Sequence, residues 1–152
     1  MQARMNHPAM ILPKAMQNLA SLNKVSHESG LPAGIIHMTH LRASQINGCS
    51  YCVELHSKEM KDAGESDERI FTVAAWREAP YFSEAERAAL AMTEALCRIS
   101  DQADPVPDDL WEEATRHFDE TELAGLLLSI ASINVWNRLN VAIHQPAGPF
   151  GA

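Results

Sequence analysis

The sequence of 152 residues has few cysteines, no basic run and no long apolar segment. Three cysteines are too few for the disulfide framework of a small secreted protein and are typical of a reducing compartment. With 20 acidic against 12 basic residues, the chain lacks the basic stripe that nucleic acid or an anionic membrane would require. No stretch approaches the roughly 18 apolar residues of a membrane-spanning helix. We therefore expect a soluble cytoplasmic protein with neither nucleic acid nor membrane as a partner.

Strand patterns are also missing, whereas apolar residues recur at helical spacing along most of the chain. The length suits one domain, and we predict an all-α helical bundle. Its expected parts are an N-terminal helix within 1–30, a core over 31–143 and a tail over 144–152. Within the core, the predicted helices run over 32–46, 49–63, 67–79, 83–99, from 107 onward, and 123–141.

Three placements follow from this pattern of apolar residues. Trp111 is expected to anchor the helix that follows Pro107 in the core. The segment 123–141 is so apolar that its helix should be central or lie at a subunit interface. In the tail, Phe150 would be anchored only by packing on a neighbour.

Two cysteines followed by a histidine make residues 47–56 the most informative stretch. In a helix that starts after Gly48, Cys49 and Cys52 lie on one face, close enough for a disulfide. His56 lies one turn beyond Cys52, where its imidazole could take the thiol proton or stabilise the thiolate. Cys52 is therefore the better candidate nucleophile. The helix N-terminus also favours a thiolate at Cys49, so the spacing alone does not decide which thiol attacks first.

This motif and its surroundings resemble the AhpD-like alkylhydroperoxidase core of the carboxymuconolactone decarboxylase superfamily. The resemblance rests on residues 41–52, 56–58 and 63–65, and it extends to 75–80 and 136–138. It implies an AhpD-like helical bundle that assembles into a homo-oligomer such as a trimer or hexamer. It also implies an antioxidant peroxidase with a redox-active disulfide, for which we expect no cofactor and no bound metal.

Carried onto this chain, the resemblance implies that Cys52, Cys49, His56 and His37 form the catalytic set. Cys52 would attack the peroxide and become a sulfenic acid, and Cys49 would condense with it to a disulfide. His56 matches the relay histidine of the family. The implied partners are a small peroxide substrate and an external dithiol, carried by a dihydrolipoamide-bearing or thioredoxin-like protein.

His37 stands where the family usually has a glutamate, twelve residues before the first cysteine. A carboxylate there would orient the imidazole of His56, whereas a neutral imidazole does so only in a suitable tautomer. Whether His37 replaces that glutamate stays open. His40, one turn later, could assist, and Glu54 is expected to point away from the thiols. Tyr51 replaces a histidine that some members have between the cysteines.

Other functions could use the same residues. Cys49, Cys52, His56 and His37 could ligate a structural zinc ion. Structural zinc sites, however, more often take their ligands from two separated knuckles than from one helix. A lyase of the decarboxylase branch would not depend on a vicinal dithiol, and the CxxC motif argues against it. A non-enzymatic oligomer could sense oxidants or bind metal through these thiols. The third cysteine, Cys97, is predicted to be a small buried hydrophobic residue.

Overall fold

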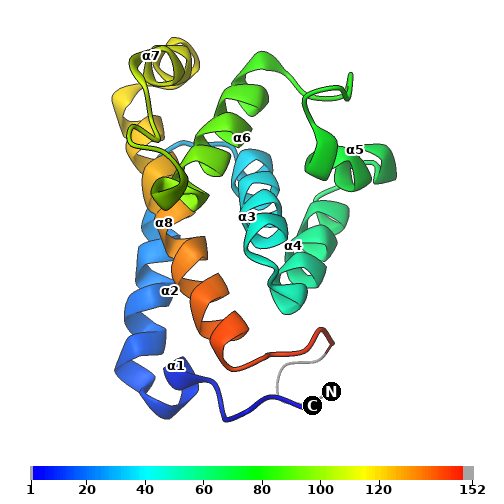
Figure 1. The fold of residues 1–152 in the computed structure, drawn as a ribbon, viewed down its shortest axis with the longest axis vertical. Coiled ribbons are helices and arrows are strands. Elements are labelled where there is room, and N and C mark those ends of the chain that lie inside the picture. Colours follow the sequence, from blue (N-terminus) through cyan, green and yellow to red (C-terminus); the bar gives the residue numbers. More distant parts are fainter. Residues whose placement is uncertain (1, 149–152) are drawn as a thin grey trace.

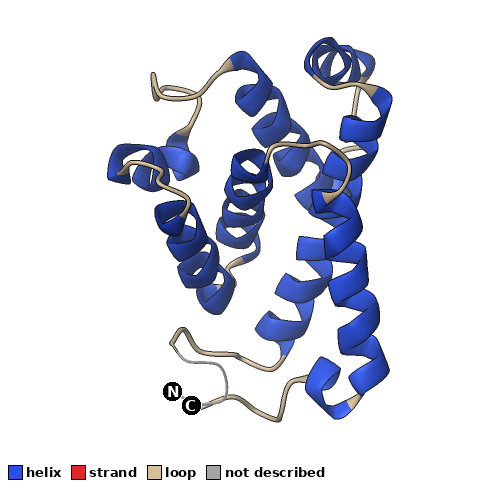
Figure 2. Ribbon diagram, turned by 180° about the vertical axis from the view of Figure 1, so that it is seen from behind, coloured by secondary structure: helices blue, strands red, loops and turns tan. Residues whose placement is uncertain are grey.

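A computed structural model describes residues 2–148, and all regular structure within them is helical (Figure 1, Figure 2). The all-α prediction is therefore confirmed, whereas the predicted packing of Phe150 lies outside the described residues. The elements are α1 (Pro8–Ile11), α2 (Pro13–His27), α3 (Ala33–Asn47), α4 (Ser50–Asp62), α5 (Asp67–Thr72), the 3-10 helix η1 (Val73–Ala75), α6 (Glu84–Cys97), the 3-10 helix η2 (Ile99–Asp101), α7 (Asp108–His117) and α8 (Glu120–Ala142).

Local sequence signals determine where the long helices begin and end. Ser83 starts α6 through a capping box, because its side chain accepts from the backbone N–H of Glu86 and the Glu86 carboxylate accepts from that of Ser83. Asp119 starts α8 in the same way. Gly48 ends α3 with a φ of 69°, a left-handed conformation that glycine adopts without strain. These boundaries agree with the predicted helices.

Three of the helix predictions are wrong. The helix predicted over 67–79 ends as α5 at Thr72 and continues only as the 3-10 helix η1 to Ala75. The N-terminal region holds two helices instead of one, because Leu12 precedes Pro13 and leaves the helical conformation, with a φ of −113° and a ψ of 86°. Trp111 does not anchor α7, since it is 42% exposed. Leu110 and Ala114 of that helix pack in the core cluster, whereas Trp111 lies at the solvent-exposed edge of the same side.

Helix α3 lies at the centre of the molecule and contacts α4, α6 and α8 (Figure 1). Its Ile35 and Ile36 belong to a core cluster shared with α6, α7 and α8. Its Met38 and Leu41 belong to a second cluster shared with α4, α5, η1 and α6. Because α3 is packed on nearly all sides, it keeps the neighbouring helices and their side chains in fixed positions.

A buried carboxylate joins α3, η1 and α6. Glu94 of α6 is 7% exposed and accepts hydrogen bonds from Arg42 of α3 at 2.8 and 2.5 Å. It also accepts from Trp76 Nε1 at 2.9 Å and from Arg77 at 2.6 Å. Removing one partner from such a cluster would leave buried charge uncompensated, so these contacts hold the helices in one arrangement.

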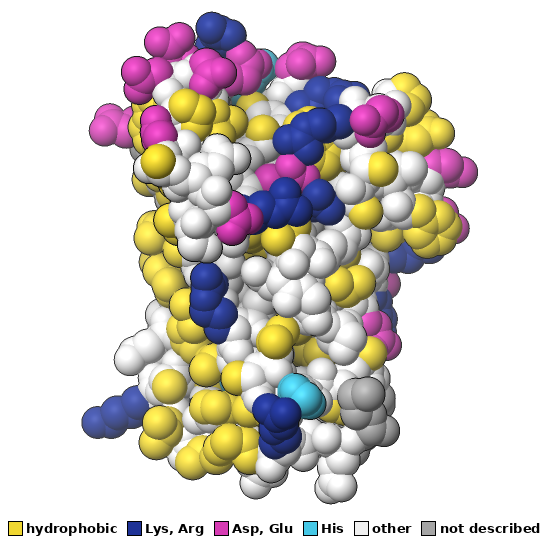
Figure 3. Space-filling model, in the orientation of Figure 1, with side chains coloured by type: hydrophobic (Ala, Val, Ile, Leu, Met, Phe, Trp, Pro, Cys, Tyr) yellow, Lys and Arg dark blue, Asp and Glu magenta, His cyan; other side chains and the backbone are white. Residues whose placement is uncertain are grey.

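The surface is divided by side-chain type. Acidic side chains gather over α7 in the view of Figure 3, and apolar ones lie along the side formed by α2 and α8. Helix α8 is buried on one side, whereas its Leu128, Val135 and Val141 are exposed. The helices of residues 2–148 are all too short or too polar to cross a lipid bilayer.

Gly125→Ala is expected to destabilise the protein. A Cβ at Gly125 would overlap Ser29 Oγ and lie 2.5 Å from Ser29 Cβ, so the loop after α2 would have to move away from α8. We expect a loss of about 1–3 kcal/mol in urea unfolding, despite the better helix propensity of alanine. Gly34→Ala is the control, because its Cβ would meet only Glu65 Oε1 at 3.4 Å. Equal unfolding midpoints for the two variants would contradict this packing.

Candidate functional site

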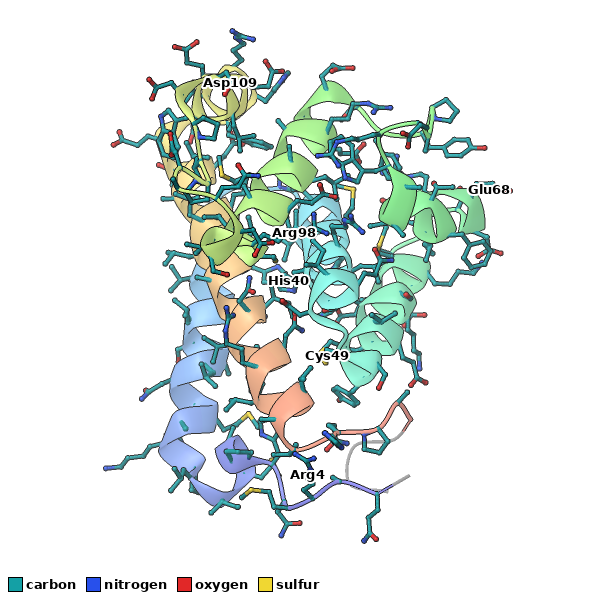
Figure 4. All side chains as sticks on the ribbon, viewed as in Figure 1. Arg4, His40, Cys49, Glu68, Arg98 and Asp109 are labelled. Carbon is teal, nitrogen blue, oxygen red and sulfur yellow. A yellow bond between two sulfur atoms is a disulfide. The ribbon has the colours of Figure 1, made fainter. Side chains whose placement is uncertain are left out.

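The sulfur atoms of Cys49 and Cys52 are joined in a disulfide at the start of α4, where Cys49 is labelled in Figure 4. Cys49 is the N-cap of α4, and its Sγ accepts a hydrogen bond from the backbone N–H of Cys52 at 3.3 Å. Gly48 positions this cap, because its left-handed backbone turns the chain from α3 into α4. Both cysteines are 2% exposed. The predicted proximity of the two sulfurs is thus confirmed.

Buried asparagines on α8 hold the turn between α3 and α4 in place through side-chain hydrogen bonds. Asn47, the last residue of α3, donates to the side-chain oxygens of Asn134 at 3.0 Å and Asn137 at 2.9 Å. Asn137 in turn donates to Ser44 Oγ at 3.1 Å. Asn140, one turn further, donates to Cys52 Sγ at 3.4 Å. Three amides on one face of α8 therefore fix the position of the disulfide.

Asn140 was not predicted as a site residue, since 88 residues separate it from Cys52. It is 3% exposed, and its Oδ1 has no hydrogen-bond partner among the residues that the structure describes. A signal does exist in the sequence, because Asn134, Asn137 and Asn140 recur every three residues in an otherwise apolar helix. Buried polar groups at such spacing need partners on a neighbouring element.

Glu59 supplies a carboxylate beside His56, although position 37 lacks one. Glu59 lies three residues after His56 on α4, and its Oε2 is 2.7 Å from His56 Nδ1. The same oxygen is 3.3 Å from Nδ1 of His37, which reaches it from α3. The imidazoles of His37 and His56, both close to the carboxylate, hold the pKa of Glu59 well below its usual range, against the opposing effect of partial burial. Glu59 is therefore a carboxylate at neutral pH.

Glu59 was not predicted as a partner of His56, although an i, i+3 spacing places the two on one helix face. The resemblance instead implied an orienting group at position 37, one helix away, and left open whether His37 fills that role. His37 instead meets the opposite side of the Glu59 carboxylate. Glu54 points elsewhere, as predicted, and its carboxylate accepts from the backbone N–H of Gly148 at 2.5 Å.

His40 packs against His56 and stays neutral. The two rings meet edge to face, with centroids 4.9 Å apart, and His40 Nε2 is 2.8 Å from Ser129 Oγ of α8. Burial, with a smaller effect of the charge on His56, keeps the pKa of His40 well below its usual value. His40, labelled in Figure 4, is therefore an uncharged side chain packed against His56.

An apolar cavity of about 410 Å³ opens onto this group of residues. Cys52, His56 and Glu59 lie on one side of it. The remaining walls come mainly from apolar side chains of α1, α2, α4 and α8, namely Met10, Met16, Leu55, Ile133 and Trp136. Mostly apolar walls with a few convergent polar groups are typical of small-molecule sites.

Cys97 lies apart from this cavity and is only half-buried, which differs from the predicted buried hydrophobic residue. Its Sγ accepts a hydrogen bond from Asn134 at 3.4 Å, and burial raises the pKa of its thiol. Within residues 2–148, no three His, Cys, Asp or Glu side chains are grouped so that they could hold a metal ion. The structure therefore gives no support to the alternative of a structural zinc site.

The carboxymuconolactone decarboxylase family model matches residues 13–95. Uncharacterized protein YdfG of Bacillus subtilis strain 168 is 32% identical over 137 residues, which are 90% of this chain and 92% of that protein. A solved Agrobacterium tumefaciens protein of unknown function, named as a candidate antioxidant defence protein AhpD, is 35% identical. Its TM-score is 0.89, with 97% of this chain and 99% of that chain covered.

The debrominase Bmp8, solved in complex with 2,3,4-tribromopyrrole, has a TM-score of 0.77. The match covers 92% of this chain and 72% of that chain, at 20% identity. This likeness concerns the fold alone.

Glu59→Gln is expected to slow the alkylation of Cys52 in the reduced protein about tenfold at neutral pH, because a neutral amide does not stabilise an imidazolium at His56. The measurement is the rate of iodoacetamide labelling of Cys52 against pH, and the curve should move to higher pH. Glu54→Gln is the matched control, since it removes a carboxylate of the same helix that faces away from the thiols. Identical curves for both variants would exclude Glu59 from the site.

Proposed function

Because the chain belongs to the carboxymuconolactone decarboxylase family and has the AhpD-like fold, we propose that it is a thiol-dependent peroxidase of the alkylhydroperoxidase type. The main support is one arrangement in the structure. The Cys49–Cys52 disulfide lies beside a histidine–carboxylate pair, His56 and Glu59, at the wall of an apolar cavity. A lyase of this family is less well supported, since it has no use for a vicinal dithiol.

The oxidative half of the cycle starts from the reduced thiols. His56 takes the proton of Cys52, and Glu59 stabilises the imidazolium that results. The Cys52 thiolate attacks one peroxide oxygen, the O–O bond breaks, and the leaving alkoxide takes the proton from His56 as an alcohol. Cys49 then attacks the sulfenic sulfur of Cys52, which releases water and forms the disulfide seen in the structure.

His37 has a positioning role in this proposal. It shares Glu59 Oε2 with His56 and is itself partly exposed, with 21% of its side chain accessible. It can therefore hold the carboxylate in place and exchange protons with solvent, without touching the thiols. In this arrangement Glu59 orients His56, which is the function that a glutamate at position 37 has in other members of the family.

The cavity and the surface suggest the substrate and the assembly. Apolar walls that include Met16 and Trp136 favour a peroxide that carries an organic group, because that group is removed from water on binding. The exposed apolar side chains of α8 suit a homo-oligomer, which we propose to be a trimer or hexamer. We further propose a cytoplasmic location, with a dihydrolipoamide-bearing or thioredoxin-like protein as the reductant.

The peroxidase proposal predicts different outcomes for the three cysteines. With an organic hydroperoxide and excess dithiol, Cys52→Ser should abolish peroxide consumption, since it removes the attacking sulfur. Without dithiol, Cys49→Ser should consume one equivalent of peroxide per chain and stop at the Cys52 sulfenic acid, because the disulfide cannot form. Cys97→Ser is the control and should keep full turnover. The proposal fails if Cys52→Ser turns over like the native protein.

His37→Gln is expected to have a smaller effect than Glu59→Gln. The 3.3 Å contact between His37 and Glu59 is partly exposed, so its loss should lower turnover by at most about fivefold. The comparison uses the pH profile of peroxide consumption for each variant and for the double variant. A larger loss for His37→Gln would place the proton relay on α3 instead of α4.

A further inference from the structure

The two cysteines line different cavities, although their sulfur atoms are bonded to each other. Cys52 lines the apolar cavity of about 410 Å³ described above. Cys49 lines a second cavity of about 270 Å³, formed by the turn at Gly48, the start of α4 and the end of α8. Asn140 lines both cavities, so it lies at the partition between them. Each cysteine of the disulfide therefore lines a cavity of its own.

The second cavity differs from the first in chemistry as well as in size. Besides Cys49 and Asn140, its walls include Ser50, His144 and Gln145, with Val141 as the main apolar contribution. The methionines and Trp136 of the first cavity have no counterpart in it. Its volume is near the lower end of the range for ligand sites, which begins at about 300 Å³. A narrow polar chain fits this space, whereas a bulky apolar group does not.

We propose that the second cavity admits the reductant, and that one thiolate of a small or flexible dithiol attacks Sγ of Cys49 there. The inference rests on the peroxidase cycle proposed above, because it assigns the step that follows disulfide formation. The peroxide and the reductant then approach the same disulfide from different cavities, without competing for one space.

The reductive step proceeds in two exchanges. The incoming thiolate forms a bond to Cys49 Sγ, and the Cys49–Cys52 bond breaks with its electron pair moving to Cys52. Cys52 leaves as a thiolate. The second thiol of the reductant, once deprotonated, attacks the reductant sulfur of the mixed disulfide, and Cys49 leaves as a thiolate. The reductant loses two electrons and two protons and becomes a disulfide, and the protein regains its dithiol.

The contacts of the two sulfurs suit this order of events. Asn140 Nδ2 donates to Cys52 Sγ at 3.4 Å, which stabilises the charge that develops there when Cys52 leaves first. The backbone N–H of Cys52 donates to Cys49 Sγ at 3.3 Å, which serves Cys49 when it leaves second. Oδ1 of Asn140, which lines both cavities, is a buried acceptor that has no hydrogen-bond partner within residues 2–148.

The first test identifies the sulfur that a thiol attacks. Protein oxidised with diamide, so that no peroxide is involved, is treated with one equivalent of β-mercaptoethanol in the presence of iodoacetamide. Fragmentation mass spectrometry of the peptide that contains both cysteines then locates the adducts. We expect mercaptoethanol on Cys49 and the alkyl group on Cys52. Mercaptoethanol on Cys52, or equally on both, would overturn the proposal, as would its absence from Cys49.

The second test blocks each cavity separately with tryptophan. Val141 lines only the second cavity and Leu55 only the first, and both are partly exposed, so the larger side chain should not prevent folding. Val141→Trp should slow reduction of the disulfide by dihydrolipoamide roughly tenfold or more, since exchange rates depend on access to the attacked sulfur. Leu55→Trp should instead slow oxidation of the reduced protein by an organic hydroperoxide.

Leu128→Trp is the matched control, because Leu128 is an equally exposed residue of α8 that belongs to neither cavity. It should leave both half-reactions unchanged, and thermal unfolding of all three variants checks that they fold. Equal slowing of reduction by Val141→Trp and Leu55→Trp would overturn the proposal. A protein that no hydroperoxide oxidises, but whose disulfide is still reduced through Cys49, would disprove the peroxidase function and leave this inference standing.

Discussion

The hydrogen bonds between the asparagines of α8 and the end of α3 are the interaction on which the rest of the site depends. Asn47 is bound by two amides of α8, and the glycine that follows it turns the chain into α4. The N-cap position of Cys49 is a direct consequence of this turn. Because buried amides are costly to leave unpaired, the turn cannot shift without breaking several hydrogen bonds at once. The position of the two sulfurs is therefore determined by α3, α4 and α8 together.

In the proposed cycle, the same geometry separates the oxidation of the thiols from the reduction of the disulfide. Helix α4 carries the histidine and the carboxylate that can move and hold a proton, on the side of the apolar cavity. The opposite side, near the end of α8, is smaller and more polar. Helix α8 thus contributes to function twice, since its amides fix the turn and Asn140 lies between the two spaces. The apolar side chains of α8 pack in the core and keep these amides buried.

Much of this could be predicted from local sequence signals. Capping residues such as Ser83, the glycine at position 48 and the three-residue spacing of the cysteines act over a few residues, and the helices and the disulfide follow from them. The break at Leu12–Pro13 is also a local signal, which the prediction of one N-terminal helix overlooked, whereas the wrong placement of Trp111 concerns tertiary contacts. The side of α7 that faces the core depends on its neighbours, so Trp111 could not be placed from periodicity alone. The spacing of the asparagines indicates that Asn140 needs a partner, but no local pattern identifies that partner as Cys52 of α4.

Glu59 is an instructive intermediate case. Its spacing from His56 is visible in the sequence, but the resemblance to the AhpD-like core implies an orienting side chain at position 37, on another helix. The structure shows that the carboxylate beside His56 comes from α4 itself, with His37 on its far side. The carboxylate of such a histidine–carboxylate pair can thus come from a different helix. The resemblance implied an orienting group beside His56, and the coordinates show that Glu59 lies there.

The central claim is that Cys52 is the sulfur that reacts with peroxide, and its sulfenic acid can be trapped directly. In Cys49→Ser protein treated with one equivalent of an organic hydroperoxide, the intermediate has no resolving thiol and should persist long enough to react with dimedone. Mass spectrometry should then find the dimedone adduct on Cys52. An adduct on Cys97, or no adduct while peroxide is still consumed, would contradict the account.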